Sequence, residues 1–164
     1  MHPLLRRFLL PTPNRAFFVR VAILALGVAG ICRYVAQPVV VDGKSMDPTY
    51  AEHGVNLCLL RAYRDRLPER GDVVALRWGG AKWLLLKRVI AFEGETVEFR
   101  DGTCYVDDSP LEEPYVRFPC DWTIPPRTIR PGHIYVMGDN RSVPASVHVG
   151  GEISAARLAG RPAW

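Results

Sequence analysis

The chain has 164 residues, of which 48% are hydrophobic and 23% are charged. This is the balance of an ordinary globular domain, and it excludes a fully disordered chain. The formal net charge is +4, but segment 1–36 carries five arginines and no acid, whereas residues 37–164 carry 16 basic and 17 acidic side chains. The body therefore has no basic surplus to hold a phosphate backbone, and we exclude a nucleic-acid-binding role.

Residues 1–36 are expected to form a tail and a transmembrane anchor. Segment 16–36 is apolar except for Arg20 and Arg33 near its two ends, and a bilayer crossing needs about 20 such residues. Three further arginines precede it, which by the positive-inside rule places the N-terminus in the cytoplasm and the body on the other side. Two alternatives stay open: a cleavable secretory signal, although no clear small-x-small cleavage site follows, and a helix of a soluble protein.

Residues 37–164 are expected to form one β-rich domain. Short apolar or alternating runs are separated by turn residues, and 14 glycines and 14 prolines argue against a helical bundle. Asp101-Gly102, between two such runs, is typical of a tight hairpin turn, and only segment 153–158 has weak helical character. The pattern predicts a mainly β, antiparallel fold with strands at 39–41, 55–60, 72–78, 83–90, 96–100, 103–106 and 133–137.

The cysteines and histidines do not predict a metal site. There is no CxxC pair and no Cys/His spacing typical of zinc, so neither a metal nor a cofactor is expected. Cys104 and Cys120 could pair in an oxidising compartment, which would leave Cys58 unpaired, and idle thiols are the alternative. The sequence predicts no oligomeric state.

Ser45 is a candidate nucleophile because it follows an apolar strand and precedes a proline-containing turn, which would expose its hydroxyl on a fixed backbone. A lysine can serve as its base only when burial lowers the lysine pKa from about 10.4. Strand alternation places Lys87 on an apolar face where it could be desolvated, although most strand lysines reach water. Lys44 is a rival base, but in an extended chain it would point away from its neighbour Ser45.

Five motifs give the chain a resemblance to the type I signal peptidase family. They occur in the family's order and extend to residue 141, behind the predicted anchor. They are 43–49 (GKSMDPT), 70–74 (RGDVV), 87–95 (KRVIAFEGE), 105–116 (YVDDSPLEEPYV) and 136–141 (VMGDNR).

The resemblance implies an antiparallel β catalytic core in a membrane-anchored serine endopeptidase that removes signal (leader) peptides from exported preproteins. By the same resemblance Ser45 is the nucleophile and Lys87 the general base, while Gly43 and Met46 adjoin the substrate and the oxyanion hole. The implied partners are signal-peptide-bearing preproteins and the lipid bilayer. We expect a single-pass protein of the bacterial inner (plasma) membrane, in preference to the mitochondrial inner membrane, with the catalytic domain on the extracytoplasmic side.

The chain departs from the family's pattern at several positions. Gly43 stands where many bacterial members have a Ser or Thr that assists the oxyanion hole, and Pro144 stands where a serine orients the catalytic lysine. Ser146 and His148 replace an Asp and an Arg that form a salt bridge in the family. Because Ser142 and Ser146 lie two residues to either side of Pro144, we expect one of them to support the lysine instead.

These departures leave two alternative functions open. The first is a catalytically weak or inactive relative that binds extended peptides or acts as an accessory subunit. The second is a specialised processing peptidase with one or few substrates.

Overall fold

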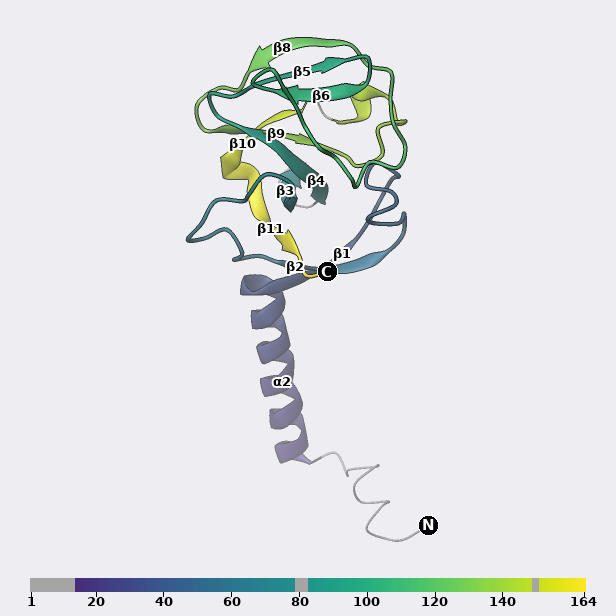
Figure 1. Cartoon of the computed structure of the whole chain (residues 1–164). Helices are drawn as coiled ribbons and strands as arrows, with labels where there is room; N and C mark the ends of the chain where they lie inside the picture. The colour runs from purple at the N-terminus through teal and green to yellow at the C-terminus, as the bar shows by residue number, and fades with distance from the viewer. Residues whose placement is uncertain (1–13, 79–82, 149–150) are drawn as a thin grey trace.

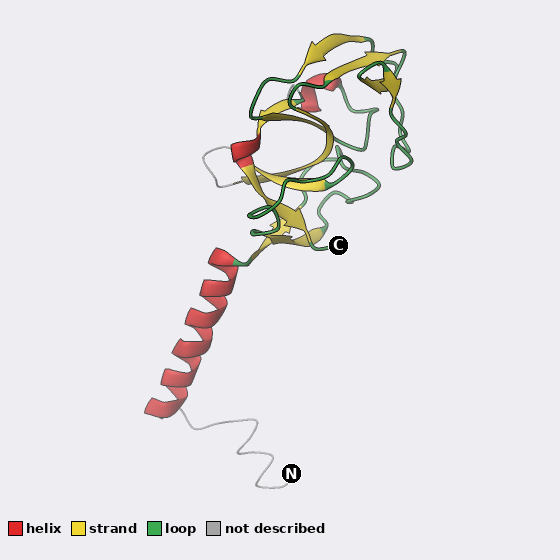
Figure 2. Cartoon of the chain, turned by 60° about the vertical axis from the view of Figure 1, so that its left-hand side comes forward, coloured by secondary structure: helices red, strands yellow, loops and turns green. Residues whose placement is uncertain are grey.

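The computed structural model describes residues 14–78, 83–148 and 151–164. It shows one long helix that projects from a β-rich body, as Figures 1 and 2 show from two directions. The helix, α2, spans Arg15–Tyr34, and none of its side chains is buried. The side chain of Asn14 caps its first turn by accepting a hydrogen bond from the Phe17 amide at 2.9 Å. The helix is long and apolar enough to cross a membrane.

The helix ends two residues before the predicted end of the anchor, because the chain enters a sheet at once. Strand β1 begins at Ala36, and the Leu60 amide donates to the Val35 carbonyl at 2.9 Å. The carbonyl of the helix C-cap is thereby satisfied by the body itself. The end of the helix is therefore attached directly to the sheet, without a linker.

The body contains two antiparallel sheets. The seven-stranded sheet has the order β1-β2-β11-β3-β4-β9-β10, and the four-stranded sheet has the order β7-β6-β5-β8. Figure 1 shows β1, β2 and β11 next to the helix and the four-stranded sheet at the far end of the body. The strands are β1 Ala36–Val40, β2 Val55–Leu59, β3 Val73–Trp78, β4 Trp83–Phe92, β5 Thr96–Arg100, β6 Thr103–Val106, β7 Ser109–Pro110, β8 Ile124–Thr128, β9 His133–Met137, β10 Glu152–Ser154 and β11 Leu158–Pro162.

The mainly antiparallel β prediction is confirmed, and each predicted strand is present with ends shifted by a few residues. The prediction of weak helical character at 153–158 is wrong for most of that segment. Only Ala155–Arg157 forms a short 3-10 turn, η2, between β10 and β11. Its flanks pair instead with β9 on one side and with β2 and β3 on the other, so tertiary pairing overrides the local helical tendency.

The predicted hairpin at Asp101-Gly102 is confirmed. Arg100 lies opposite Thr103, and both turn residues have positive φ, 48° for Asp101 and 83° for Gly102. A two-residue turn of this kind matches the right-handed twist of the flanking strands. A side chain at Gly102 would also strike the backbone, because a Cβ there would lie 2.0 Å from the Cys120 carbonyl oxygen.

Three clusters of buried apolar side chains form the core. One fills the space around Phe99 under the four-stranded sheet, and another surrounds Met46 between the seven-stranded sheet and the loop that follows β1. The four cysteines are free thiols, so the Cys104–Cys120 disulfide is not formed in this structure. The Met46 cluster lies next to the segment that carries Ser45, because Met46 directly follows that residue.

Candidate active site

Ser45 and Lys87 meet although 42 residues separate them in the sequence. Ser45 lies in the loop after β1 and Lys87 lies on β4. The Lys87 Nζ donates a hydrogen bond to the Ser45 Oγ at 2.7 Å. The Lys87 residue is 1% exposed, and across the described residues its side chain forms this hydrogen bond alone. A nucleophile and a base within hydrogen-bond reach are the first requirement of general-base catalysis.

The environment of Lys87 favours the neutral amine. Burial lowers the pKa of Lys87 from 10.5 to about 8, and the nearby Asp139 carboxylate opposes this effect by favouring the charged form. At pH 7 a base with such a pKa is neutral in roughly one molecule in ten, against far fewer than one in a thousand at the ordinary value. A larger share of neutral amine therefore lies beside the Ser45 hydroxyl at pH 7 than an exposed lysine would supply.

The loop that carries Ser45 is held from two sides. The Asn140 amide donates to the Ser45 carbonyl, and the Asn140 side-chain amide donates to the Lys44 carbonyl, both at 3.0 Å. On the other side Met46 is 2% exposed in the core cluster beneath the loop. Gly43 has a φ of 84°, a left-handed conformation that glycine adopts without strain. The backbone that carries Ser45 is thus held on both sides.

Asp139 connects three of the sequence motifs. It is fully buried and accepts from Arg88 Nε at 2.8 Å and from Arg88 Nη2 at 2.5 Å. It also accepts from the Thr49 hydroxyl at 2.5 Å. Arg88 in turn donates to the Gly71 carbonyl at 2.6 Å. The Arg-Gly-Asp, Lys-Arg and Gly-Asp-Asn motifs are therefore one hydrogen-bonded unit behind the Ser45–Lys87 pair.

A second buried ion pair brings in the remaining motif. Arg141 is 1% exposed and donates to both carboxylate oxygens of Glu113, at 3.0 and 2.5 Å. Tyr115 donates its hydroxyl to the same carboxylate, and its ring lies 3.9 Å from the Arg88 guanidinium carbon. Planar two-point contacts of this kind fix geometry as well as charge. These residues support the site without touching Ser45 or Lys87.

Comparison with known proteins decides the family. The family model described as "Signal peptidase, peptidase S26" matches residues 15–163. The chain belongs to the signal peptidase S26 family. It is an endopeptidase of the signal peptidase I type, anchored in the membrane by α2.

Individual relatives agree with the family. A probable signal peptidase I-1 of Synechocystis sp. is 30% identical, and the match covers 92% of this chain and 83% of that protein. A signal peptidase I of Mycobacterium tuberculosis is 29% identical over 78% of this chain and 60% of the relative. The crystal structure of a signal peptidase I from Enterococcus faecalis V583 has a TM-score of 0.49 and 27% identity, over 58% of this chain and 97% of that chain.

The two serines predicted to support Lys87 form no hydrogen bond with the Ser45–Lys87 pair among the described residues. Ser142 and Ser146 are exposed, and the Ser142 hydroxyl donates to the Asn140 side-chain oxygen at 2.6 Å. Neither serine forms a hydrogen bond with Lys87 in the described part of the chain. Position 148 lies in the 3-10 turn η1, Ala145–His148, and its side chain is outside the described parts. Support of Lys87 by either serine stays a prediction.

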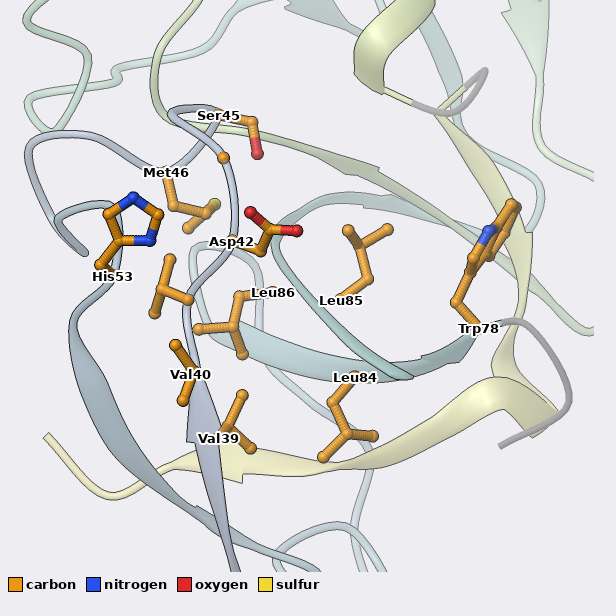
Figure 3. Close-up of a pocket in the computed structure, with 12 residues that line it drawn as sticks. Val39, Val40, Asp42, Ser45, Met46, His53, Trp78, Leu84, Leu85 and Leu86 are labelled. Carbon is orange, nitrogen blue, oxygen red and sulfur yellow. The ribbon is translucent and has the colours of Figure 1, made fainter. Parts of the chain in front are cut away.

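A mainly apolar cleft opens beside Ser45. Its volume is about 370 Å³. Figure 3 shows Ser45 at one end, the segment from Val39 to Asp42 along one side and Leu84 to Leu86 along the other. Segments 39–42 and 84–86 are therefore the two banks of the cleft. His53, Trp78 and Leu84 to Leu86 also line the cleft. Sequence reasoning did not assign these to a binding surface, although the alternation of β4 could have pointed to its leucines.

Both banks of the cleft can accept a peptide backbone. Among the described residues β1 pairs with β2 alone, so its other edge has no strand partner. Strand β9 pairs with β4 only from Arg88 to Phe92, so residues 84–86 of β4 also have one edge without a strand partner there. An extended peptide can add to such edges as a further strand. No group of three His, Cys, Asp or Glu side chains that could hold a metal occurs in residues 14–78, 83–148 and 151–164.

Proposed function

We propose that this signal peptidase removes signal peptides from exported preproteins with a Ser45–Lys87 dyad. The observation that carries the proposal is the 2.7 Å contact between Lys87 Nζ and Ser45 Oγ, with the lysine buried. Family membership supports the substrate class. The apolar cleft beside Ser45 supports an extended substrate whose small side chains face leucine and valine.

The short contact between Lys87 and Ser45 supports the following acylation half of the reaction. Neutral Lys87 accepts the Ser45 proton as the Ser45 oxygen attacks the scissile carbonyl carbon of the signal peptide. The resulting oxyanion faces backbone amides of the loop that Asn140 and Met46 hold in place. The protonated lysine then gives its proton to the leaving amine, the mature protein departs, and an ester joins Ser45 to the signal peptide.

Deacylation reuses the same base. Once the amine has left, Lys87 is neutral again and accepts a proton from a water molecule that attacks the ester. The carboxylate of the signal peptide is released and Ser45 regains its proton from the lysine. One buried amine therefore serves both half-reactions. A change in its position relative to Ser45 would impair acylation and deacylation alike.

The same proposal assigns the two parts of the chain. Residues 1–36 form the cytoplasmic tail and anchor, and residues 37–164 form the catalytic domain on the extracytoplasmic face of a bacterial inner membrane. The arginines before α2 support this orientation. Protease added to spheroplasts should digest the body, and a body protected from that protease would contradict the orientation.

Variants of the full chain test the dyad. Ser45→Ala and Lys87→Met should each abolish cleavage of a presequence peptide. Lys44→Met is the matched control, because it removes an exposed lysine adjacent to Ser45 and should leave the rate within about twofold. A wild type that cleaves no more than Ser45→Ala does, with both at background, would instead favour a peptide-binding or accessory role. That outcome is worth testing because neither Ser142 nor Ser146 forms a hydrogen bond with Lys87 in the described part of the chain.

A further inference from the structure

Two adjoining cavities lie where α2 meets the β-rich body. The first, of about 500 Å³, has Ala29, Cys32 and Arg33 of α2 on one side and Arg77 of β3 on the other. The second, of about 380 Å³, is lined by Arg61, Arg64 and Arg77. Both cavities have Leu60 and Arg77 in their linings, so they adjoin each other. We call Arg33, Arg61, Arg64 and Arg77 the arginine cluster.

The arginine cluster has no counter-charge from the chain. The linings of both cavities contain no Asp or Glu, and none of the four guanidinium groups pairs with a described carboxylate. Arg77 donates to the Leu158 carbonyl at 3.1 Å. The residues outside the described ranges include no Asp or Glu in the sequence.

The acids that follow Arg64 in the sequence, Asp65, Glu69 and Asp72, line neither cavity. Glu69 lies 3.9 Å from Arg66, and Asp72 accepts from Tyr63 and from the Glu69 amide. The buried arginines behind the active site, by contrast, each bind a carboxylate. Four guanidinium groups around two adjoining cavities, without a carboxylate partner among the described residues, are therefore set up to receive an anion from outside the chain.

The position of the cluster identifies the kind of anion. Arg33 lies in the last turn of α2. Ala29 lies five residues before the helix end, so it is about 7.5 Å deeper along the helix axis, on the side away from the β-rich body. In a bilayer spanned by α2, the first cavity therefore lies beside the boundary between headgroups and acyl chains. Its lining has the matching polarity, with Ala29, Cys32 and Leu84 beside the guanidinium groups.

We propose that the arginine cluster binds the phosphate of an anionic phospholipid, with the beginning of an acyl chain against Ala29 and Leu84. A guanidinium group offers two parallel donors to phosphate oxygens, and it keeps its charge at all physiological pH values. An anionic headgroup is favoured over a zwitterionic one because the latter carries its own cation. The bound lipid would hold the body against the membrane surface. This proposal rests on the anchor helix and is independent of the Ser45–Lys87 dyad.

Native mass spectrometry of the full chain tests the proposal. The protein is released from mixed micelles that contain equal amounts of phosphatidylglycerol and phosphatidylcholine, and retained lipid is counted. The wild type should retain phosphatidylglycerol preferentially. Arg61→Gln with Arg64→Gln should weaken this binding about 25-fold, since each arginine near a lipid surface contributes roughly a factor of five. The control, Arg100→Gln with Arg117→Gln, removes the same charge from the four-stranded sheet and its loop and should bind like the wild type.

A second variant separates binding from folding. Arg33 lies on the helix outside the sheets, so Arg33→Gln leaves the body intact and should weaken phosphatidylglycerol binding roughly fivefold. Equal retention of the two lipids by the wild type would overturn the proposal, as would equal losses in the cluster and control variants. Displacement of the lipid by 10 mM inorganic phosphate at constant ionic strength would show a site for free phosphate and overturn the lipid assignment.

Discussion

Replacement of Lys87 by methionine should abolish cleavage and at the same time stabilise the fold at neutral pH. Methionine has a similar length and carries no charge, so it can fill the same buried space between β4 and the loop of Ser45. The wild-type residue is 1% exposed and must carry an ammonium group there whenever it is protonated. The variant removes the free-energy cost of burying that charge, and it also removes the proposed general base.

The pKa of Lys87 sets the size of the effect. Its pKa falls from 10.5 to about 8 because of burial. A pKa difference of one corresponds to about 1.4 kcal/mol, so this depression opposes folding by about 3 kcal/mol when the lysine is charged. Below pH 8 both the folded and the unfolded chain hold the proton, and the full cost is present. Between pH 8 and 10.5 only the unfolded chain holds it, so the stability of the wild type rises with pH and the cost disappears.

Urea unfolding of the full chain in detergent, followed by tryptophan fluorescence, measures this difference. At pH 7 Lys87→Met should be more stable than the wild type by about 2–3 kcal/mol, and the gap should shrink by about that amount at pH 10.5. In parallel, kcat/KM of the wild type should rise about tenfold per pH unit below 8 and level off above it, since kcat/KM reports the free enzyme. A gap between variant and wild type that does not change from pH 7 to pH 10.5 would refute a neutral buried amine.

Four further substitutions probe the surroundings of the dyad. Asp139→Asn should destabilise the fold by about 3–5 kcal/mol in urea unfolding, because it leaves Arg88 without its buried partner, and it should move the kcat/KM profile to lower pH, because the carboxylate now raises the lysine pKa. Gly43→Ser, which restores the family's hydroxyl, should lower stability by about 1 kcal/mol and fail to raise kcat, because a φ of 84° strains any side chain. Of Ser142→Ala and Ser146→Ala, one should lower the cleavage rate severalfold, and unchanged rates in both would end the idea that either serine supports the catalytic amine.

Much of the active site was accessible to sequence reasoning because it depends on local pattern. The apolar segment before residue 36 predicts the helix, and period-two alternation places Lys87 on an apolar face of its strand. The dipeptide Asp101-Gly102 predicts a hairpin because only certain residues tolerate positive φ at both turn positions. The motif around Ser45 predicts the nucleophile by resemblance alone, and no local pattern could give its distance to the lysine.

The hydrogen bonds that hold the Ser45–Lys87 pair in place could not be predicted from local sequence pattern. Nothing near Asp139 in the sequence indicates that it binds Arg88 and Thr49, since that contact joins segments 51 and 90 residues apart. The segment 153–158 was misassigned for the same reason, because its strands exist only through partners on β9, β2 and β3.

The sequence by itself determined the elements of this signal peptidase: an apolar helix, short strands with glycine and proline turns, and a serine and a lysine in recognisable motifs. The helix and strands follow from hydrophobic periodicity and the turns from backbone sterics, which act between near neighbours, whereas the serine and lysine motifs are read from the family resemblance. Only the tertiary structure decided that Lys87 is desolvated against Ser45 and that four arginines gather without acids at the end of α2. Desolvation and charge balance depend on what packs around a group in space, and distant parts of the chain supply those neighbours.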